Sequence, residues 1–192
     1  MKKDIILSGV GGQGILSIAT VIGDAATNAG LYLKQAEVHG MSQRGGDVQS
    51  HLRLSHDPIY SDLIPQGETD VIISMEPMEA LRYVSWLKPT GWLVTGSQPL
   101  INIPNYPDTE ALQQELASQP QVARLNIETM AKEAQTPKSA NMILLGMAAP
   151  YIEIISPEDL RNSIINIFKS KGEKIISDNL KAFDLGYNTT KR

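Results

Sequence analysis

The stretch that decides the fold is Asp4-Ile5-Ile6-Leu7-Ser8, which runs directly into Gly9-Val10-Gly11-Gly12-Gln13-Gly14-Ile15-Leu16. An apolar run that ends in clustered glycines and resumes as a helical pattern predicts a strand, a tight turn and the start of a helix. Glycine adopts positive φ at no steric cost, and the first N–H groups of a helix attract anions. We therefore predict an anion-binding glycine turn at residues 9–14, with the candidate residues Gly9, Gly11, Gly12, Gln13 and Gly14.

The pattern of strand followed by helix continues along the chain. Short apolar or alternating runs predict strands at residues 31–35, 48–55, 69–75, 91–95 and 122–127. Helices are predicted at residues 15–28, 76–87 and 108–116, then in a helical C-terminal part at 140–149, 157–168 and 176–185, before a loose polar tail at 188–192. Such alternation predicts an α/β fold, a three-layer α/β/α arrangement with a mostly parallel, mixed central sheet. We expect residues 1–192 to form a single domain.

A second candidate site follows the predicted strand at 31–35. We call it the charged glycine segment, residues 37–47: Glu37-Val38-His39-Gly40-Met41-Ser42-Gln43-Arg44-Gly45-Gly46-Asp47. It has neither a helical nor a strand period, and an arginine flanked by glycines has room to approach a phosphate or carboxylate with both its nitrogens. The candidate residues are His39, Ser42, Gln43, Arg44, Gly45 and Gly46. We expect this segment and the glycine turn to meet at one rim of the sheet.

Composition limits the classes of function. The net charge is −4, which gives no basic surface for nucleic acid or an anionic membrane. The absence of Cys excludes disulfides and thiolate ligands for an iron–sulfur cluster, and the three histidines have no zinc-site spacing. The first residues lead straight into a strand, without a signal-peptide pattern or a membrane-length apolar run, so we expect a cytoplasmic chain.

Two further interpretations stay open at this point. Glu37 lies where a dinucleotide fold carries the acid that binds ribose hydroxyls, so the chain could be a free-standing NAD-binding oxidoreductase. Alternatively, the glycines are purely structural and the chain is a non-catalytic assembly subunit. Glu76, at the end of a predicted central strand, fits a helix-start acid better than a catalytic base. We assign no catalytic residue, because ligand-holding loops without a complete reaction centre are typical of a subunit.

Four motifs together resemble a known family. They are GVGGQGIL at 9–16, HGMSQRGG at 39–46, MEPMEAL at 75–81 and Asn141-Met142, in the same order over about the whole chain. The chain resembles the gamma-type subunits of 2-oxoacid:ferredoxin oxidoreductases, and its HGMSQRGG form is similar to that of the small, beta subunits of the indolepyruvate enzymes.

This resemblance implies a hetero-oligomeric complex that oxidatively decarboxylates an aryl pyruvate to an acyl-CoA and carbon dioxide and reduces ferredoxin. It implies that a large, alpha partner subunit carries thiamine diphosphate, magnesium and the iron–sulfur clusters. It also associates this chain with the coenzyme A side of the active centre. The glycine turn and the charged glycine segment are then expected to help bind coenzyme A, a co-substrate.

Overall fold

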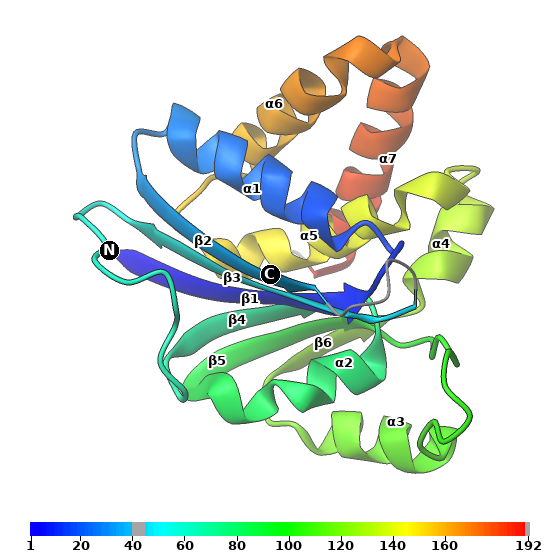
Figure 1. Cartoon of the computed structure of the whole chain (residues 1–192). Coiled ribbons are helices and arrows are strands. Elements are labelled where there is room, and N and C mark those ends of the chain that lie inside the picture. Colours follow the sequence, from blue (N-terminus) through cyan, green and yellow to red (C-terminus); the bar gives the residue numbers. More distant parts are fainter. Residues whose placement is uncertain (40–44, 191–192) are drawn as a thin grey trace.

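A computed structural model describes residues 1–39 and 45–190 (Figure 1). Within these residues one sheet has the strand order β2-β3-β1-β4-β5-β6. The strands are β1 (Lys2–Val10), β2 (Tyr32–His39), β3 (Asp47–Ser55), β4 (Thr69–Ser74), β5 (Leu87–Gly96) and β6 (Val122–Leu125). β1, β4, β5 and β6 are parallel, whereas β3 is antiparallel to both β1 and β2. The mixed, mostly parallel sheet predicted from the sequence is confirmed.

Helices cover both faces of this sheet (Figure 1). On one face lie α1 (Ile15–Asn28), α4 (Ile127–Glu133), α5 (Ala140–Ile152), α6 (Pro157–Phe168) and α7 (Glu173–Thr190). On the other face lie α2 (Pro77–Arg82) and α3 (Thr109–Ser118). Short 3-10 turns span Val84–Trp86, Pro137–Ser139 and Lys169–Lys171. The three-layer arrangement with a helical C-terminal part therefore agrees with the prediction.

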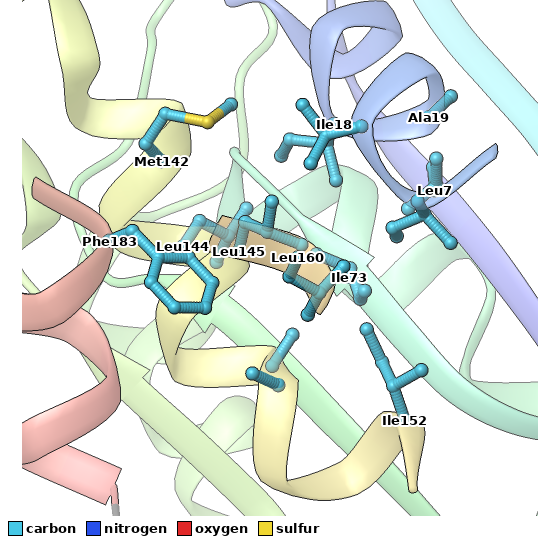
Figure 2. Packing of buried hydrophobic residues seen from close by; sticks show 14 of the residues in the cluster. Leu7, Ile18, Ala19, Ile73, Met142, Leu144, Leu145, Ile152, Leu160 and Phe183 are labelled. Carbon is cyan, nitrogen blue, oxygen red and sulfur yellow. The ribbon is translucent and has the colours of Figure 1, made fainter. Parts of the chain in front are cut away.

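The core lies on both sides of the sheet, because successive side chains of a strand point to opposite faces. Ile6 contributes to a smaller cluster with Ile72 and Leu93, beneath α2 and α3. Figure 2 shows part of the larger cluster, to which both strands and helices contribute: Leu7 of β1, Ile73 of β4, Ile18 of α1, Leu145 of α5, Leu160 of α6 and Phe183 of α7. Burial on both faces explains why the central strands are continuous apolar runs.

Helix α1 ends at Asn28, the predicted boundary, and a glycine lies just beyond its C-cap. Ala29 is the C-cap, and Gly30 follows it with a φ of +69°. The N–H of Gly30 donates to the carbonyl of Thr27 at 3.1 Å, and the N–H of Leu31 donates to that of Ala26 at 3.0 Å. This is the Schellman arrangement, which satisfies the last carbonyls of the helix and turns the chain toward β2.

Several predicted boundaries are wrong. β2 continues to His39, so residues 37–39 belong to a strand instead of an aperiodic loop, because each pairs with a residue of β3. α2 ends at Arg82, about one turn early, and β5 already begins at Leu87. β6 ends at Leu125 because Asn126 caps α4, a helix that was not predicted, by accepting the N–H of Thr129 at 3.0 Å.

The polar tail predicted to be loose is instead helical as far as Thr190, the last residue described. Its packing against α5 gives the reason, since the Thr190 hydroxyl donates to the carbonyl of Met147 at 3.1 Å. Among the described residues no helix has both the length and the apolar character needed to cross a membrane.

Candidate functional site

The glycine turn and the charged glycine segment touch at the rim where the parallel strands end, which we call the carboxyl rim. The N–H of Gly11 donates to the carbonyl of Gly46 at 2.8 Å. Next to this contact, Val10 of β1 pairs with Asp47 of β3. His39 ends β2 at the same rim, whereas the candidates Ser42, Gln43 and Arg44 lie outside the described residues. The structure thus brings the described ends of the two segments together.

The glycine turn is braced by one of its own side chains. The Oε1 atom of Gln13 accepts the N–H of Val10 at 2.8 Å, and the N–H of Gln13 donates to the carbonyl of Val10 at 3.1 Å. A Cβ on Gly9 would lie 2.9 Å from Cγ1 of Ile15, so only glycine lets the turn sit this close to α1. The side-chain oxygen of Gln13 is therefore engaged inside the turn, and Gln13 shapes the loop.

Helix α1 begins at the glycine turn without a side-chain cap. Gly14 is its N-cap, with a left-handed φ of +83°, and its first turn contains no acidic residue. The Nδ2 atom of Asn141 donates to the carbonyl of Gly14 at 3.1 Å. Because the first N–H groups of a helix have no partner within the helix, this end carries partial positive charge at the carboxyl rim. This environment suits a phosphate or carboxylate.

Asn141 plays a part that its sequence context did not predict. Asn141 and Met142 open α5, and Met142 is fully buried in the core. The N-cap of α5 is Ser139, however, and Asn141 reaches from the first turn of α5 to the glycine turn. The sequence did contain one indication of this role, because Asn141 belongs to one of the four motifs that resemble the known family.

A third segment, residues 97–107 between β5 and α3, also reaches this rim. The Nδ2 atom of Asn102 donates to the carbonyl of Gly45 at 2.7 Å. Glu76 is fully buried at the end of β4, where it caps α2 by accepting the N–H of Glu79 at 2.9 Å. It also accepts the N–H of Leu100 at 3.3 Å and the hydroxyl of Tyr106. The helix-start interpretation of Glu76 agrees with these contacts.

Burial and charge change the pKa of the groups around α2. Burial raises the pKa of Glu79, although the Arg82 guanidinium, 2.9 Å away, acts in the opposite direction. Burial also raises the pKa of Tyr83 to about 12. Burial and the hydrogen bond to Glu76 raise the pKa of Tyr106, which keeps its hydroxyl protonated as a donor. The hydrogen bond of Glu79 to Arg82 thus lies within α2, and that of Tyr106 to Glu76 joins the segment 97–107 to the start of this helix.

The position of Glu37 does not suit a dinucleotide site. In that fold the ribose-binding acid ends the strand next to the first strand. Here β3 lies between β1 and β2. Glu37, on β2, pairs with Ser50 of β3, so a whole strand separates Glu37 from β1 and the glycine turn that follows it. Gln35 donates a side-chain hydrogen bond to Glu37.

His51 is a core histidine in the middle of β3. Its Nδ1 atom accepts the N–H of Ile64 at 3.0 Å, and its ring forms a T-shaped pair with Trp86, with 5.1 Å between the ring centroids. Burial, and next the nearby Arg53, lower the pKa of His51. Among residues 1–39 and 45–190, no group of three or more His, Cys, Asp or Glu side chains could hold a metal ion.

His51 should make the stability of the chain depend on pH. A lowered pKa means that the unfolded chain binds the proton first as the pH falls, so stability is complete above about pH 6.5 and declines below it. In His51→Asn, an amide oxygen can still accept the N–H of Ile64. Urea denaturation would measure the free energy of unfolding at about pH 7 and pH 5. Between these two values, the natural chain should lose more of this free energy than His51→Asn does. Equal losses would contradict a neutral His51.

Comparison with known proteins identifies the class to which this fold and site belong. The chain belongs to the pyruvate ferredoxin/flavodoxin oxidoreductase family, whose model matches residues 4–189. It is 34% identical to the indolepyruvate oxidoreductase subunit IorB of Thermococcus kodakarensis, over 100% of this chain and 98% of that protein. It is 35% identical to IorB of Archaeoglobus fulgidus, over 98% of this chain and 95% of that one.

Solved structures share the fold. The 2-oxoglutarate:ferredoxin oxidoreductase from Magnetococcus marinus, with 2-oxoglutarate, coenzyme A and succinyl-CoA bound, matches with a TM-score of 0.76 and 25% identity. The match covers 99% of this chain and 31% of that one. The keto/oxoacid ferredoxin oxidoreductase gamma subunit from Geobacter sulfurreducens matches over 98% of both chains, with a TM-score of 0.70 and 24% identity. The chain is thus an oxidoreductase subunit that works with partner subunits, and a free-standing NAD enzyme is not favoured.

Proposed function

We propose that this chain is the small subunit of an aryl pyruvate:ferredoxin oxidoreductase, with indolepyruvate as the substrate class. The complex would convert a 2-oxoacid and coenzyme A to an acyl-CoA and carbon dioxide, and pass two electrons to ferredoxin. The observation that carries this proposal is the similarity to indolepyruvate oxidoreductase subunits along the full length of the chain. The preference for an aryl group rests on the names of these relatives.

Within this complex we assign the chain to the coenzyme A side of the active centre. The support is geometric: the N–H of Gly11 binds the carbonyl of Gly46, so two glycine-bearing segments share one rim beside the uncapped start of α1. Amide donors at a helix start bind phosphate, and Arg44, in the adjoining segment, would add a charged donor. Orienting coenzyme A in this way would bring its thiol toward the acyl group.

The remaining chemistry is assigned to the large, alpha subunit. Thiamine diphosphate with magnesium would there supply the decarboxylation, and iron–sulfur clusters would carry electrons to ferredoxin. This chain has no Cys, so it has no thiolate with which to ligate a cluster. Its own residues would bind and orient the co-substrate and complete the cleft. A cytoplasmic location stays a prediction from the sequence.

Arg44→Ala in the reconstituted complex should raise the KM for coenzyme A by roughly tenfold. A hydrogen bond to a charged group contributes about 1.5–3 kcal/mol, which corresponds to at least that factor. We expect kcat and the KM for the 2-oxoacid to change by less than about twofold, because the reacting carbon is held by the partner. Steady-state kinetics with each substrate varied in turn would measure this.

Arg161→Ala is the matched control, because Arg161 is a half-exposed arginine of α6 paired with Asp184 and Glu158, away from the carboxyl rim. It should leave the KM for coenzyme A unchanged. Pull-down of the large subunit by the Arg44→Ala chain should also be unaffected. An unchanged KM in Arg44→Ala would contradict the assignment to coenzyme A, and a lost pull-down would make the segment a docking surface instead.

A further inference from the structure

Residues 97–107 contact the charged glycine segment at Gly45 and contact Glu76, which follows the central strand β4. We propose that these residues form a third wall of the coenzyme A site, and that Glu76 and Tyr106 are positioning residues that hold this wall in place. The inference rests on the proposed function for the ligand. The arrangement of the wall itself is inferred from contacts among described residues alone.

The first step concerns how the wall is anchored. Oε1 of Glu76 accepts the N–H of Leu100, in the first half of the segment, and the hydroxyl of Tyr106, near its end. Oε2 of Glu76 accepts the N–H of Glu79, so the carboxyl group is itself fixed by α2. A buried carboxyl group is costly unless it is hydrogen-bonded. The conformation in which Leu100 and Tyr106 approach Glu76 is therefore strongly favoured.

The second step leads from the wall to the candidate site. Between the two anchored positions, Asn102 donates to the carbonyl of Gly45 at 2.7 Å. The next carbonyl, of Gly46, accepts the N–H of Gly11 at 2.8 Å. A continuous series of contacts thus runs from Glu76 through Asn102 to the glycine turn. Moving the wall would move the carbonyl of Gly45, and with it the partner of Gly11.

The third step is that local structure cannot replace these contacts. β5 ends at Gly96 and α3 begins at Thr109, so the segment between them has no helix or strand to fix its path. A loop of this kind is positioned by the side chains that tie it to a rigid scaffold. The raised pKa of Tyr106 is consistent with a hydroxyl that stays protonated and keeps donating to Glu76.

Two variants test the wall in the reconstituted complex. Tyr106→Phe removes only the hydroxyl, and Asn102→Ala removes only the amide that binds Gly45. Each should raise the KM for coenzyme A about three- to tenfold and change kcat by less than about twofold, because a loosened loop weakens binding but touches no reacting atom. Tyr60→Phe and Asn188→Ala are the matched controls, since Tyr60 is 94% exposed at the opposite rim and Asn188 is exposed on α7.

Hydrogen exchange of the full chain without its partner provides a second readout. In Tyr106→Phe and Asn102→Ala, the amide of Gly11 should exchange at least about fivefold faster than in the natural chain, whereas amides of β4 should not change. The controls should leave Gly11 unchanged. A merely structural defect would instead raise exchange throughout the sheet.

The outcomes separate this inference from the proposed function. If Arg44→Ala raises the KM for coenzyme A but neither wall variant does, the inference is overturned and the proposed function stands. If none of the three variants raises that KM, the assignment of this rim to coenzyme A fails, and the inferred wall of a coenzyme A site fails with it. Unchanged exchange at Gly11 in both wall variants would overturn the inference.

Discussion

Gly146→Ala is expected to lower the free energy of unfolding by about 3–5 kcal/mol. Gly146 lies where α5 crosses α7, and a Cβ added there would lie 2.0 Å from the carbonyl oxygen of Phe183. The reciprocal glycine, Gly186 of α7, would place a Cβ 2.0 Å from the carbonyl oxygen of Ile143. Overpacking a core typically costs about 1–3 kcal/mol, and the cost is higher here because two helix backbones must move apart.

Urea denaturation of the full chain would measure this loss, with Gly23→Ala as the matched control. Gly23 is also a helical glycine, but its added Cβ would meet Leu33 at 3.5 Å, an ordinary contact. Alanine is favoured over glycine inside a helix by about 0.5–1 kcal/mol, so this control should be neutral or slightly stabilising. Similar losses in the two variants would contradict a close crossing of α5 and α7.

The same helix pair illustrates what a single sequence leaves open. The apolar run at 140–149 suited either a core or an interface, because its pattern has no polar side. In the structure this run belongs to the core. Helix α5 lies between the sheet and α7 (Figure 1), and its Leu144, Leu145 and Met147 are fully buried. Which surface covers an apolar helix is set by distant segments, and local periodicity does not record it.

Local patterns nevertheless predicted the elements that carry the candidate site. The run at Ile5–Leu7, the glycine turn and the start of α1 depend on neighbours within a few residues, and they appear as predicted. The meeting of the turn and the charged glycine segment was also predicted, because strands of one direction end at the same rim. In contrast, the contact of Asn141 with Gly14 spans 127 residues, and that of Asn102 with Gly45 spans 57. Contacts over such separations depend on the complete fold.

Arg53→Met should also destabilise the chain strongly, by about 3–5 kcal/mol. Arg53 of β3 is 8% exposed, and its guanidinium binds both carboxylate oxygens of the fully buried Asp4 at 2.9 and 3.2 Å. Removing one partner of a buried ion pair leaves the other charge without compensation, which costs about this amount. Lys2 also contacts Asp4, but it is 45% exposed and compensates only in part. Chemical denaturation near neutral pH would measure the loss.

Arg161→Met is the control for this change, because Arg161 pairs with Asp184 at the surface, where an ion pair contributes about 0–1 kcal/mol. The double variant Asp4→Leu/Arg53→Met should be more stable than Arg53→Met alone, since it removes the uncompensated carboxylate together with its partner. Arg53 has other partners as well, the carbonyls of Ser61 and Leu63 at 3.0 and 2.9 Å. If the double variant were no more stable than Arg53→Met, Arg53 would stabilise the chain mainly through its hydrogen bonds to Ser61 and Leu63. The ion pair with Asp4 would then contribute less.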